Sequence, residues 1–415
     1  MNRKFIILVG DGMGDYPLDE LGGKTPLEAA RTPNLDRMAR AGRVGTVRTV
    51  PEGMEPGSDV ANMSLLGYDP AVYHTGRSPL EAASMGISLK PDETAFRCNL
   101  VFLDADGSGR QTMGDYSAGH ITTTESHRLI AALQEATSGT PLRLYPGISY
   151  RHLLVWPAGP YNLDTTPPHD IPGLPVFEYQ QVYRENPVLW VFMQDAARLL
   201  SDHPVNLSRT AGGKRPANAV WLWGQGRAPR MPTLKERFGL TGAMISAVDL
   251  LKGLGVYAGL DPIIVPGATG YLDTNYEGKV AAALDALRHK DLVFVHIEAP
   301  DEASHEGSLE KKIEAIEAFD ERVAGPLSEG ARQFESVSML VVTDHFTPIS
   351  KRTHTADPAP FLLIGELNAA GTPAISGASY NERTADASGW RLDNGVELFT
   401  LLAGRKEKTA AHQER

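Results

Sequence analysis

Short apolar runs alternate with amphipathic segments in the first and last parts of the chain. Continuous apolar runs lie at Phe5–Val9, Leu292–Val295 and Met339–Val342. Runs of this length, rich in Val and Ile, are typical of strands that are buried on both faces of a parallel sheet. Between the second and third runs, apolar side chains recur at helical spacing over Lys311–Val323, which predicts an amphipathic helix. Strand, helix and strand in this order predict a βαβ unit. An earlier helix is expected to begin at Thr32–Pro33, with the threonine as its cap.

The middle of the chain has a different pattern. Strand candidates at Phe96–Phe102, His152–Trp156 and Ala219–Trp223 alternate with loops rich in Pro and Gly. We therefore predict an α/β fold with a doubly wound, mostly parallel sheet and a smaller inserted α+β domain. The expected bounds are 1–87 and 239–404 for the core, 88–238 for the insert and 405–415 for a flexible tail. An insert hinged near a functional site is expected to act as a lid.

Acidic residues follow each of the three apolar runs of the core. Asp11 follows the first run, Asp301 the second and Asp344 the third. Because the carboxyl ends of parallel strands meet at one edge of a sheet, these side chains are expected to lie close together. Three histidines stand at metal-ligand spacing from them, namely His305, His345 and His354. Taken alone, each Asp is more simply explained as a helix cap or a turn residue. The combination with three histidines favours a metal centre.

Carboxylate oxygens and imidazole nitrogens together select borderline divalent cations. We expect two such ions, with manganese as the first choice and zinc, cobalt or magnesium as alternatives. A pair of divalent cations is suited to phosphoryl transfer, because it neutralises the phosphoryl oxygens. The sequence therefore predicts a small phosphorylated substrate.

Composition and charge narrow the class of protein. With 415 residues, two domains are the expected organisation. A formal net charge of −11 argues against nucleic acid as a partner, because its recognition needs a basic face. No stretch is long enough to cross a bilayer, and no secretory signal is evident, so a cytoplasmic location is expected. The chain has one cysteine, Cys98, which excludes an intramolecular disulfide and is expected to be a buried apolar residue.

Ser58 is a candidate nucleophile. Pro56–Gly57 predicts a tight turn, after which residues 58–66 are expected to form a helix. Ser58 then lies at a helix N-terminus, where backbone amides and the helix dipole favour an alkoxide or a phosphate. Coordination to a metal ion would lower the pKa of its hydroxyl further. The alternative is that Ser58 is an ordinary N-cap.

These motifs, in this order, resemble the cofactor-independent phosphoglycerate mutases of the archaeal type, which belong to the alkaline phosphatase superfamily. The resemblance extends from Phe5 to about Leu402. It rests on the segments Asp11–Gly14, Gly57–Asn62, Tyr73–Ala82, Val265–Gly270, Asp301 with His305, Asp344–His345 and His354–Phe361. The conjunction of these motifs is highly specific for the superfamily.

The resemblance implies a reaction and a set of ligands. One ion would be held by Asp11, Ser58, Asp344 and His345. The other would be held by Asp301, His305 and His354. The serine would take the phosphoryl group from 3-phosphoglycerate and return it to the 2-hydroxyl, without 2,3-bisphosphoglycerate, as an isomerase of glycolysis and gluconeogenesis. Lys252 resembles the lysine that family members direct at the phosphoryl group, although a solvated residue at a helix end is its simpler interpretation.

The residues that bind the glycerate are less well defined by the sequence. Arg77 and Arg151 could each pair with a carboxylate or a phosphate, although surface charge is the simpler interpretation of either. Candidate acid–base groups of the insert are Asp115, His120, His169 and Asp170. The Arg-x-x-Arg motif of the bacterial-type mutases is replaced here by the stretch Trp221–Arg227.

Three other functions compete with mutase activity. The chain resembles proposed homoserine kinases of threonine biosynthesis in Pro51–Met54 and Tyr68–Pro70, but it has no Walker-type loop for a nucleotide. Hydrolysis of phosphomonoesters by the same superfamily site is a second alternative. A metal-stabilised binding domain is the third, and Ser58 argues against it because structural metal sites are usually closed.

Overall fold

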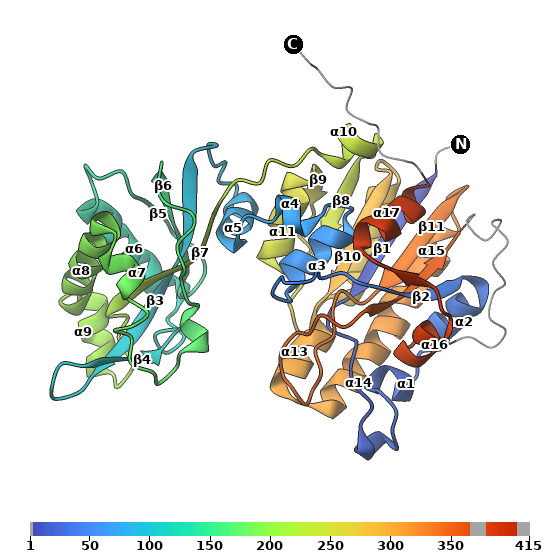
Figure 1. Cartoon of the computed structure of the whole chain (residues 1–415), viewed down its shortest axis with the longest axis horizontal. Coiled ribbons are helices and arrows are strands. Elements are labelled where there is room, and N and C mark those ends of the chain that lie inside the picture. Colours follow the sequence, from blue (N-terminus) through green and yellow to red (C-terminus); the bar gives the residue numbers. More distant parts are fainter. Residues whose placement is uncertain (1–2, 366–378, 405–415) are drawn as a thin grey trace, which may run out of the picture. The chain divides into compact units, whose positions relative to one another are not determined.

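The structure is a computed structural model that describes residues 3–365 and 379–404. The chain divides into two compact units: a core unit, residues 1–74 with 230–415, and an inserted unit, residues 75–229. The core unit is therefore built from both ends of the chain (Figure 1). The tail predicted at 405–415 lies outside the described residues.

The core unit contains an eight-stranded sheet in the order β13-β2-β12-β11-β1-β10-β8-β9. The five strands from β11 to β9 are parallel, whereas β12 runs antiparallel to both of its neighbours. This confirms the predicted α/β class with a mostly parallel sheet. The strands are β1 (Lys4–Gly10), β2 (Arg43–Val47), β8 (Gly242–Ile245), β9 (Leu260–Pro262), β10 (Leu292–Ile297), β11 (Val337–Val342), β12 (Ala359–Ile364) and β13 (Arg391–Leu392).

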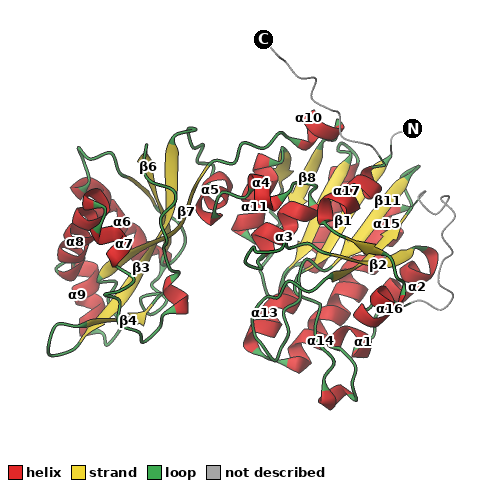
Figure 2. Ribbon diagram, viewed as in Figure 1, coloured by secondary structure: helices red, strands yellow, loops and turns green. Residues whose placement is uncertain are grey.

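Helices cover both faces of this sheet, which is why its central strands are buried along their whole length (Figure 2). Side chains alternate between the faces, so that Ile6 and Leu8 of β1 join the core beneath α2, α12, α14 and α15. Helices α3, α11 and α17 pack together elsewhere in the unit. The helices are α1 (Pro26–Ala29), α2 (Pro33–Ala41), α3 (Ser58–Leu65), α4 (Pro70–Tyr73), α10 (Leu234–Phe238), α11 (Asp249–Tyr257), α12 (Tyr276–Leu287), α13 (Ala299–Glu306), α14 (Leu309–Ala318), α15 (Gly325–Ala331), α16 (Glu382–Ala387) and α17 (Gly395–Ala403), with the 3-10 turn η1 (Asp19–Leu21).

The helix predicted over Lys311–Val323 differs in detail from the observed one. Helix α14 ends at Ala318 and continues as a π-helical segment, η3 (Phe319–Ala324). Within η3, Asp320 accepts hydrogen bonds from the backbone N–H groups of Asn34 and Leu35 in the first turn of α2. Thr32 occupies the cap position of α2, but its side chain makes no capping bond. The cap therefore comes from a distant segment, which local sequence signals do not reveal.

The inserted unit is an antiparallel sheet flanked by helices. Its five strands have the order β4-β3-β6-β5, with β7 paired to β3. Helices α6, α8 and α9 lie along one face of this sheet (Figure 1). The strands are β3 (Glu93–Ala105), β4 (Gln111–Asp115), β5 (Arg143–Tyr145), β6 (Arg151–Pro157) and β7 (Ala219–Arg227). The helices are α5 (Arg77–Ser84), α6 (Thr123–Ala136), α7 (Gln181–Arg184), α8 (Pro187–Ser201) and α9 (Pro204–Ala211), with the 3-10 turn η2 (Pro168–Asp170).

The unit boundaries lie at 74/75 and 229/230, whereas the expected ones were 87/88 and 238/239. Helix α5 packs on β3 and β7, and the Ser78 hydroxyl donates to the carbonyl of Gly224 at 2.6 Å. At the second boundary, the N–H of Leu234 in α10 donates to the carbonyl of Ala258 in the core unit. Contacts with residues far away in the sequence therefore decide that α5 belongs to the inserted unit and α10 to the core unit.

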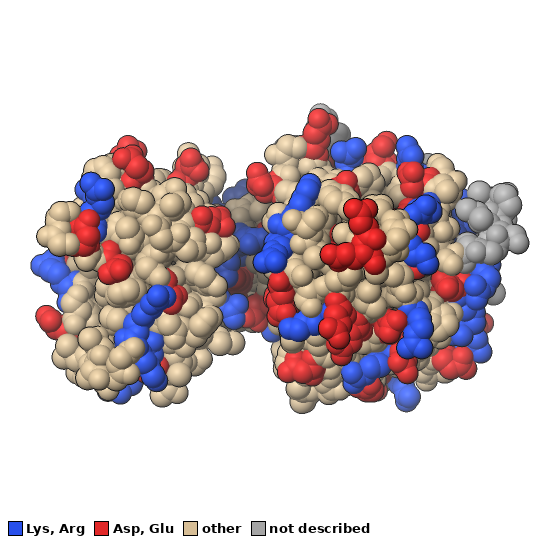
Figure 3. All heavy atoms as spheres, turned by 90° about the horizontal axis from the view of Figure 1, so that it is seen from below, with Lys and Arg blue, Asp and Glu red and all other residues tan. Residues whose placement is uncertain are grey.

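Each unit carries both acidic and basic side chains on the face shown in Figure 3, where they are interspersed. On this face, the net charge of −11 is therefore not gathered into one block. Among the described residues, no helix is long and apolar enough to span a membrane.

Cys98 provides a test of the core of the inserted unit. Its side chain is 0% exposed on β3, and burial raises the pKa of its thiol to about 12. We predict that a thiol reagent such as DTNB leaves the native protein unlabelled at pH 8, because the reactive thiolate is neither formed nor accessible. One thiol per chain should react once guanidinium unfolds the protein. Rapid labelling of the native protein would contradict the placement of β3.

Candidate active site

Two clusters of acidic and histidine side chains lie near the carboxyl ends of β1, β10 and β11. The first cluster, here called the Asp11 triad, consists of Asp11, Asp344 and His345. The second, the Asp301 triad, consists of Asp301, His305 and His354. In each triad, one potential ligand atom per residue lies within 4.8 Å of the others. The predicted convergence of strand ends thus brings all six residues into two groups with the composition of metal sites.

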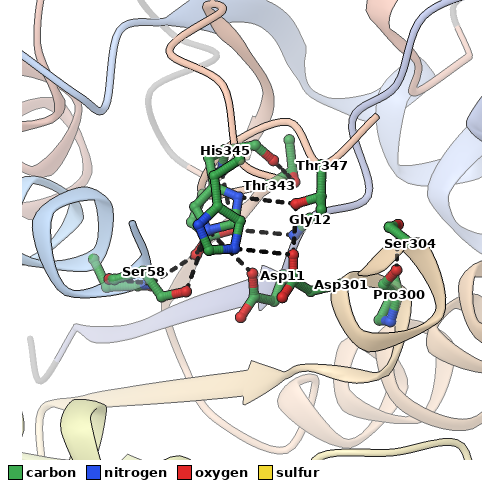
Figure 4. Close-up of polar contacts among 12 residues, drawn as sticks. Asp11, Gly12, Ser58, Pro300, Asp301, Ser304, Thr343, His345 and Thr347 are labelled. Carbon is green, nitrogen blue, oxygen red and sulfur yellow. Dashed lines mark hydrogen bonds and ion pairs between the residues drawn. The ribbon is translucent and has the colours of Figure 1, made fainter. Parts of the chain in front are cut away.

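The Asp11 triad is enclosed. Its three side chains are at most 1% exposed. The Nε2 atom of His345 lies 3.5 Å from Asp11 Oδ1 and 3.4 Å from Asp344 Oδ2. The same nitrogen lies 3.2 Å from the Ser58 hydroxyl (Figure 4). Two carboxylates, one imidazole and one hydroxyl therefore face a common point.

Ser58 is the first residue of α3, and Gly57 is the N-cap. No side-chain capping bond is made at this helix end, so the serine is not an ordinary cap. Asn62, one turn further along, donates its side-chain amide to the Ser58 carbonyl and to Asp344 Oδ2, both at 2.8 Å. The amide therefore connects the start of α3 to a carboxylate of the triad, and the serine hydroxyl is left to face His345.

The Asp301 triad is more open than its neighbour. Asp301 and His305 stand four residues apart on α13, where their side chains share one helix face. The Nε2 atom of His305 lies 3.1 Å from Asp301 Oδ2, and that of His354 lies 3.5 Å from Asp301 Oδ1. His305 Nδ1 donates to the carbonyl of Arg352 at 2.9 Å, which leaves Nε2 as the atom that can bind a metal ion.

The electrostatics of the Asp11 triad call for a cation. Burial, and then the charges of Asp344 and Asp301, raise the pKa of Asp11 well above its ordinary value. Both oxygens of Asp11 are buried without a hydrogen bond. Such atoms are costly unless a partner is present, and a divalent cation supplies one. The residues therefore fit a bound metal ion. His296 Nε2 lies 2.9 Å from Asp11 Oδ2, and burial lowers the pKa of His296 to about 3, so that its ring is neutral.

Gly12 allows the two triads to approach each other. Its φ angle is +60°, which favours glycine. A Cβ atom at this position would lie 2.5 Å from Asp301 Oδ1 and 2.6 Å from the Thr347 hydroxyl. A side chain here would displace one of these groups, which gives a physical reason for the glycine that follows Asp11.

A buried ion pair joins the loops that carry the ligands. Lys312 Nζ donates to Asp15 Oδ2 at 2.8 Å, and both side chains are 0% exposed. The same ammonium group donates to the carbonyls of Gly14 at 3.2 Å and Thr347 at 3.0 Å. Asp15 also accepts from the N–H of Ile349 at 3.1 Å. Lys312 therefore holds the loop after β1 against the loop after β11.

Comparisons with known proteins show which family the chain belongs to. A family model described as 2,3-bisphosphoglycerate-independent phosphoglycerate mutase matches residues 39–206. The probable 2,3-bisphosphoglycerate-independent phosphoglycerate mutase of Geobacter sulfurreducens is 52% identical over 404 residues, which cover 97% of this chain and 100% of that protein. The chain belongs to the archaeal-type 2,3-bisphosphoglycerate-independent phosphoglycerate mutases. The resemblance found in the sequence is thereby confirmed.

Further proteins match most of the chain. The 2,3-bisphosphoglycerate-independent phosphoglycerate mutase of Methanosarcina acetivorans is 54% identical over 364 residues, covering 87% of this chain and 90% of that protein. The solved cofactor-independent phosphoglycerate mutase from Thermoplasma acidophilum has a TM-score of 0.65 at 28% identity, covering 97% of this chain and 99% of that one. A solved protein from Pyrococcus horikoshii has a TM-score of 0.81 at 28% identity, covering 99% and 100%.

Lys252 lies on α11, which packs against α3, the helix that Ser58 begins. Its ammonium group is 2.6 Å from Asp249 Oδ1, one turn earlier on the same helix. Its side chain is mostly buried, at 16% exposed, so the solvated helix end considered from the sequence is not what the structure has. Lys252 stays a predicted ligand of the phosphoryl group in this mutase family member.

Within the inserted unit, Arg77 and Arg151 lie near a third arginine, Arg97, which the sequence interpretation missed. Burial, together with the charges of Arg77 and Arg151, lowers the pKa of the Arg97 guanidinium, although Glu81 opposes this effect at 2.9 Å. Arg97 also stacks on Trp223, with 4.2 Å from its Cζ to the ring centroid. The sequence around Arg97 could have drawn attention to it, because a charged residue there lies between the apolar residues Phe96 and Cys98 within a predicted strand.

The four acid–base candidates of the insert are placed differently from one another. His169 lies beside Trp223, with 5.2 Å between ring centroids, and burial followed by the charges of Arg97 and Arg77 lowers its pKa against the opposing effect of Asp170. His120 stacks edge-on against Tyr150, with 6.5 Å between centroids. Asp115, in contrast, accepts hydrogen bonds from the turn that follows β4, including the N–H groups at positions 117 and 119, and from Arg215. Asp115 therefore stabilises the turn that follows β4.

The Lys312–Asp15 pair yields a prediction about stability. Replacing Lys312 by Met should lower the free energy of unfolding by about 3–5 kcal/mol, because Asp15 is left buried without its counter-ion. Urea denaturation of the metal-free protein measures this loss. Lys311→Met is the matched control, since Lys311 contacts Glu306 at the surface and its loss should leave stability almost unchanged. Equal effects of the two substitutions would contradict the role given to Lys312.

Proposed function

We propose that this chain interconverts 3-phosphoglycerate and 2-phosphoglycerate, with Ser58 as the transient phosphoryl acceptor and without 2,3-bisphosphoglycerate. The observation that carries this proposal is the Ser58 hydroxyl 3.2 Å from His345 Nε2, at a helix N-terminus and beside two buried carboxylates. Relatives that carry this activity in their names match nearly the full length of the chain. Serine placement and family membership support the same reaction.

The two triads are the proposed metal sites. Asp11, Ser58, Asp344 and His345 would hold one ion, and Asp301, His305 and His354 the other, with manganese as the first choice. Such ions neutralise the phosphoryl oxygens and lower the pKa of a bound hydroxyl. Two observations support this assignment: the buried oxygens of Asp11 accept no hydrogen bond, and His305 uses Nδ1 for the Arg352 carbonyl and turns Nε2 toward Asp301.

The transfer conserves atoms and protons within the substrate and Ser58. The Ser58 oxygen attacks phosphorus, the bond from phosphorus to the 3-oxygen breaks, and the serine proton ends on that oxygen. Glycerate then presents its 2-hydroxyl, which attacks the phosphoserine and returns a proton to the serine oxygen. The dipole of α3 favours the negative charge at Ser58 during both steps. Lys252, on the neighbouring helix α11, is proposed to bind the phosphoryl group.

The inserted unit is proposed to bind glycerate and to act as the lid. The arginine cluster of Arg77, Arg97 and Arg151 has the charge needed to bind the carboxylate of glycerate. His169 and His120, which lie among aromatic rings in this unit, are proposed as proton carriers for the hydroxyl groups. Closure of a lid would exclude water and so protect the phosphoserine from hydrolysis.

A direct assay tests the proposed reaction. The purified, manganese-loaded protein is expected to form 2-phosphoglycerate from 3-phosphoglycerate with no added 2,3-bisphosphoglycerate, as followed by an enolase-coupled absorbance change. Removal of metal with EDTA should abolish the rate, and added manganese should restore it. Release of inorganic phosphate in place of 2-phosphoglycerate would identify a phosphomonoesterase. Phosphorylation of homoserine by ATP, with no mutase activity, would identify the kinase.

Ser58→Ala should lower mutase turnover by more than about 10³-fold, because the phosphoryl group loses its acceptor. Both metal ions should remain bound, since all six carboxylate and imidazole side chains of the two triads are unchanged, and metal analysis of the dialysed variant checks this. Ser64→Ala is the matched control: Ser64 is buried on the same helix, and its hydroxyl accepts only a backbone N–H, that of Gly395, at 3.0 Å. Turnover retained by Ser58→Ala would overturn the covalent route.

A further inference from the structure

The hydroxyl of Thr347 lies between the two triads. Thr347 follows His345 by two residues and is 0% exposed. Its hydroxyl donates to Asp301 Oδ1 at 2.5 Å, and the same oxygen lies 3.2 Å from His345 Nδ1. Figure 4 shows both contacts, which extend from one side chain toward a member of each triad. Thr347 is therefore in contact with both proposed metal sites at once.

The direction of each hydrogen bond follows from which of the three groups, hydroxyl, carboxylate and imidazole, can donate a proton. An ionised carboxylate only accepts, so the single hydroxyl proton of Thr347 goes to Asp301. The Thr347 oxygen can then only accept from His345, which requires the proton of the neutral imidazole to be on Nδ1. His345 Nε2 is left as a lone pair directed at Ser58 and the two carboxylates of its triad. One hydroxyl thus selects the histidine tautomer in one triad and orients the carboxylate in the other.

The backbone of Thr347 is held independently of its side chain. Its N–H donates to the carbonyl of Gly14 at 3.1 Å, and its carbonyl accepts from Lys312 Nζ at 3.0 Å. A substitution that removes only the hydroxyl should therefore leave the loop in place. The absence of a Cβ atom at Gly12 provides the space in which the hydroxyl reaches Asp301.

We propose that Thr347 is a positioning residue that supports both metal sites through its hydroxyl, so that its loss weakens the binding of both ions. This inference rests on the proposed two-metal function. Partners that orient metal ligands through hydrogen bonds typically change metal affinity about 10–100-fold when they are removed. A residue that contacts the ligands of only one triad would change the affinity for one ion, whereas loss of the Thr347 hydroxyl is expected to lower the affinity for both ions.

The test measures manganese binding to the full chain by calorimetry and by the EPR signal of free manganese. Two single-site backgrounds separate the ions: His305→Ala removes a ligand of the Asp301 triad, and Asp344→Ala removes a ligand of the Asp11 triad. Thr347→Val, which is nearly isosteric, should weaken manganese binding about 10–100-fold in each background. Thr347→Ser, which keeps the hydroxyl, should restore binding in both.

Thr49→Val is the matched control. Thr49 is buried at 1% exposed, and its hydroxyl donates to the backbone carbonyl of Asp344 rather than to a ligand side chain. It should leave both affinities unchanged. Wild-type affinity in Thr347→Val, weakening of one site alone, or failure of Thr347→Ser to restore binding would each overturn the inference. If the wild-type protein binds fewer than two ions, the two-metal proposal itself fails, and this inference fails with it.

Discussion

The crowding of buried carboxylates at one edge of the sheet is the constraint on which the rest of the core unit depends. Asp11, Asp301 and Asp344 are each at most 5% exposed, and burial, followed by the charges of the other two carboxylates, raises the pKa of Asp11. Such a group of anions is stable only with compensating positive charge. Within the Asp301 triad, the two histidines provide this compensation. Burial alone would raise the pKa of Asp301, but hydrogen bonds from His305 and His354 hold it well below its ordinary value. In the Asp11 triad, the buried carboxylate oxygens of Asp11 accept no hydrogen bond, and a divalent cation is the proposed compensation.

A rigid frame is needed to keep these charges together. The parallel strands β1, β10 and β11 deliver the three loops to one edge, with their registers locked by continuous backbone pairing. The loops are then joined by side chains that do no chemistry of their own. Lys312 connects the loops after β1 and β11, Asn62 connects α3 to Asp344, and Thr347 connects the two triads. The geometry of the site is thus distributed over elements that are far apart in the chain.

Much of this arrangement could be predicted, because it rests on short-range patterns. Each carboxylate lies within four residues of the end of a buried strand, so apolar runs locate the site edge without knowledge of the fold. The supporting residues could not be found in this way. Thr347 and Asn62 are small polar residues that look ordinary in the sequence, and their importance depends on partners 46 and 282 positions away. Lys312 could have been noticed in the sequence, because it lies on the same predicted helix face as the apolar residues Ile316 and Phe319.

The sequence by itself determined the fold class, and it indicated the candidate metal ligands and the candidate nucleophile, because hydrophobic periodicity and residue chemistry are local properties of the chain. Only the tertiary structure decided that Ser58 faces His345 instead of capping its helix, that Asp115 supports a turn, and that Arg97 joins the arginine cluster. These outcomes depend on which distant groups share a buried space. Hydrogen bonds and charges act over a few ångströms, and the chain brings such groups together only when it folds.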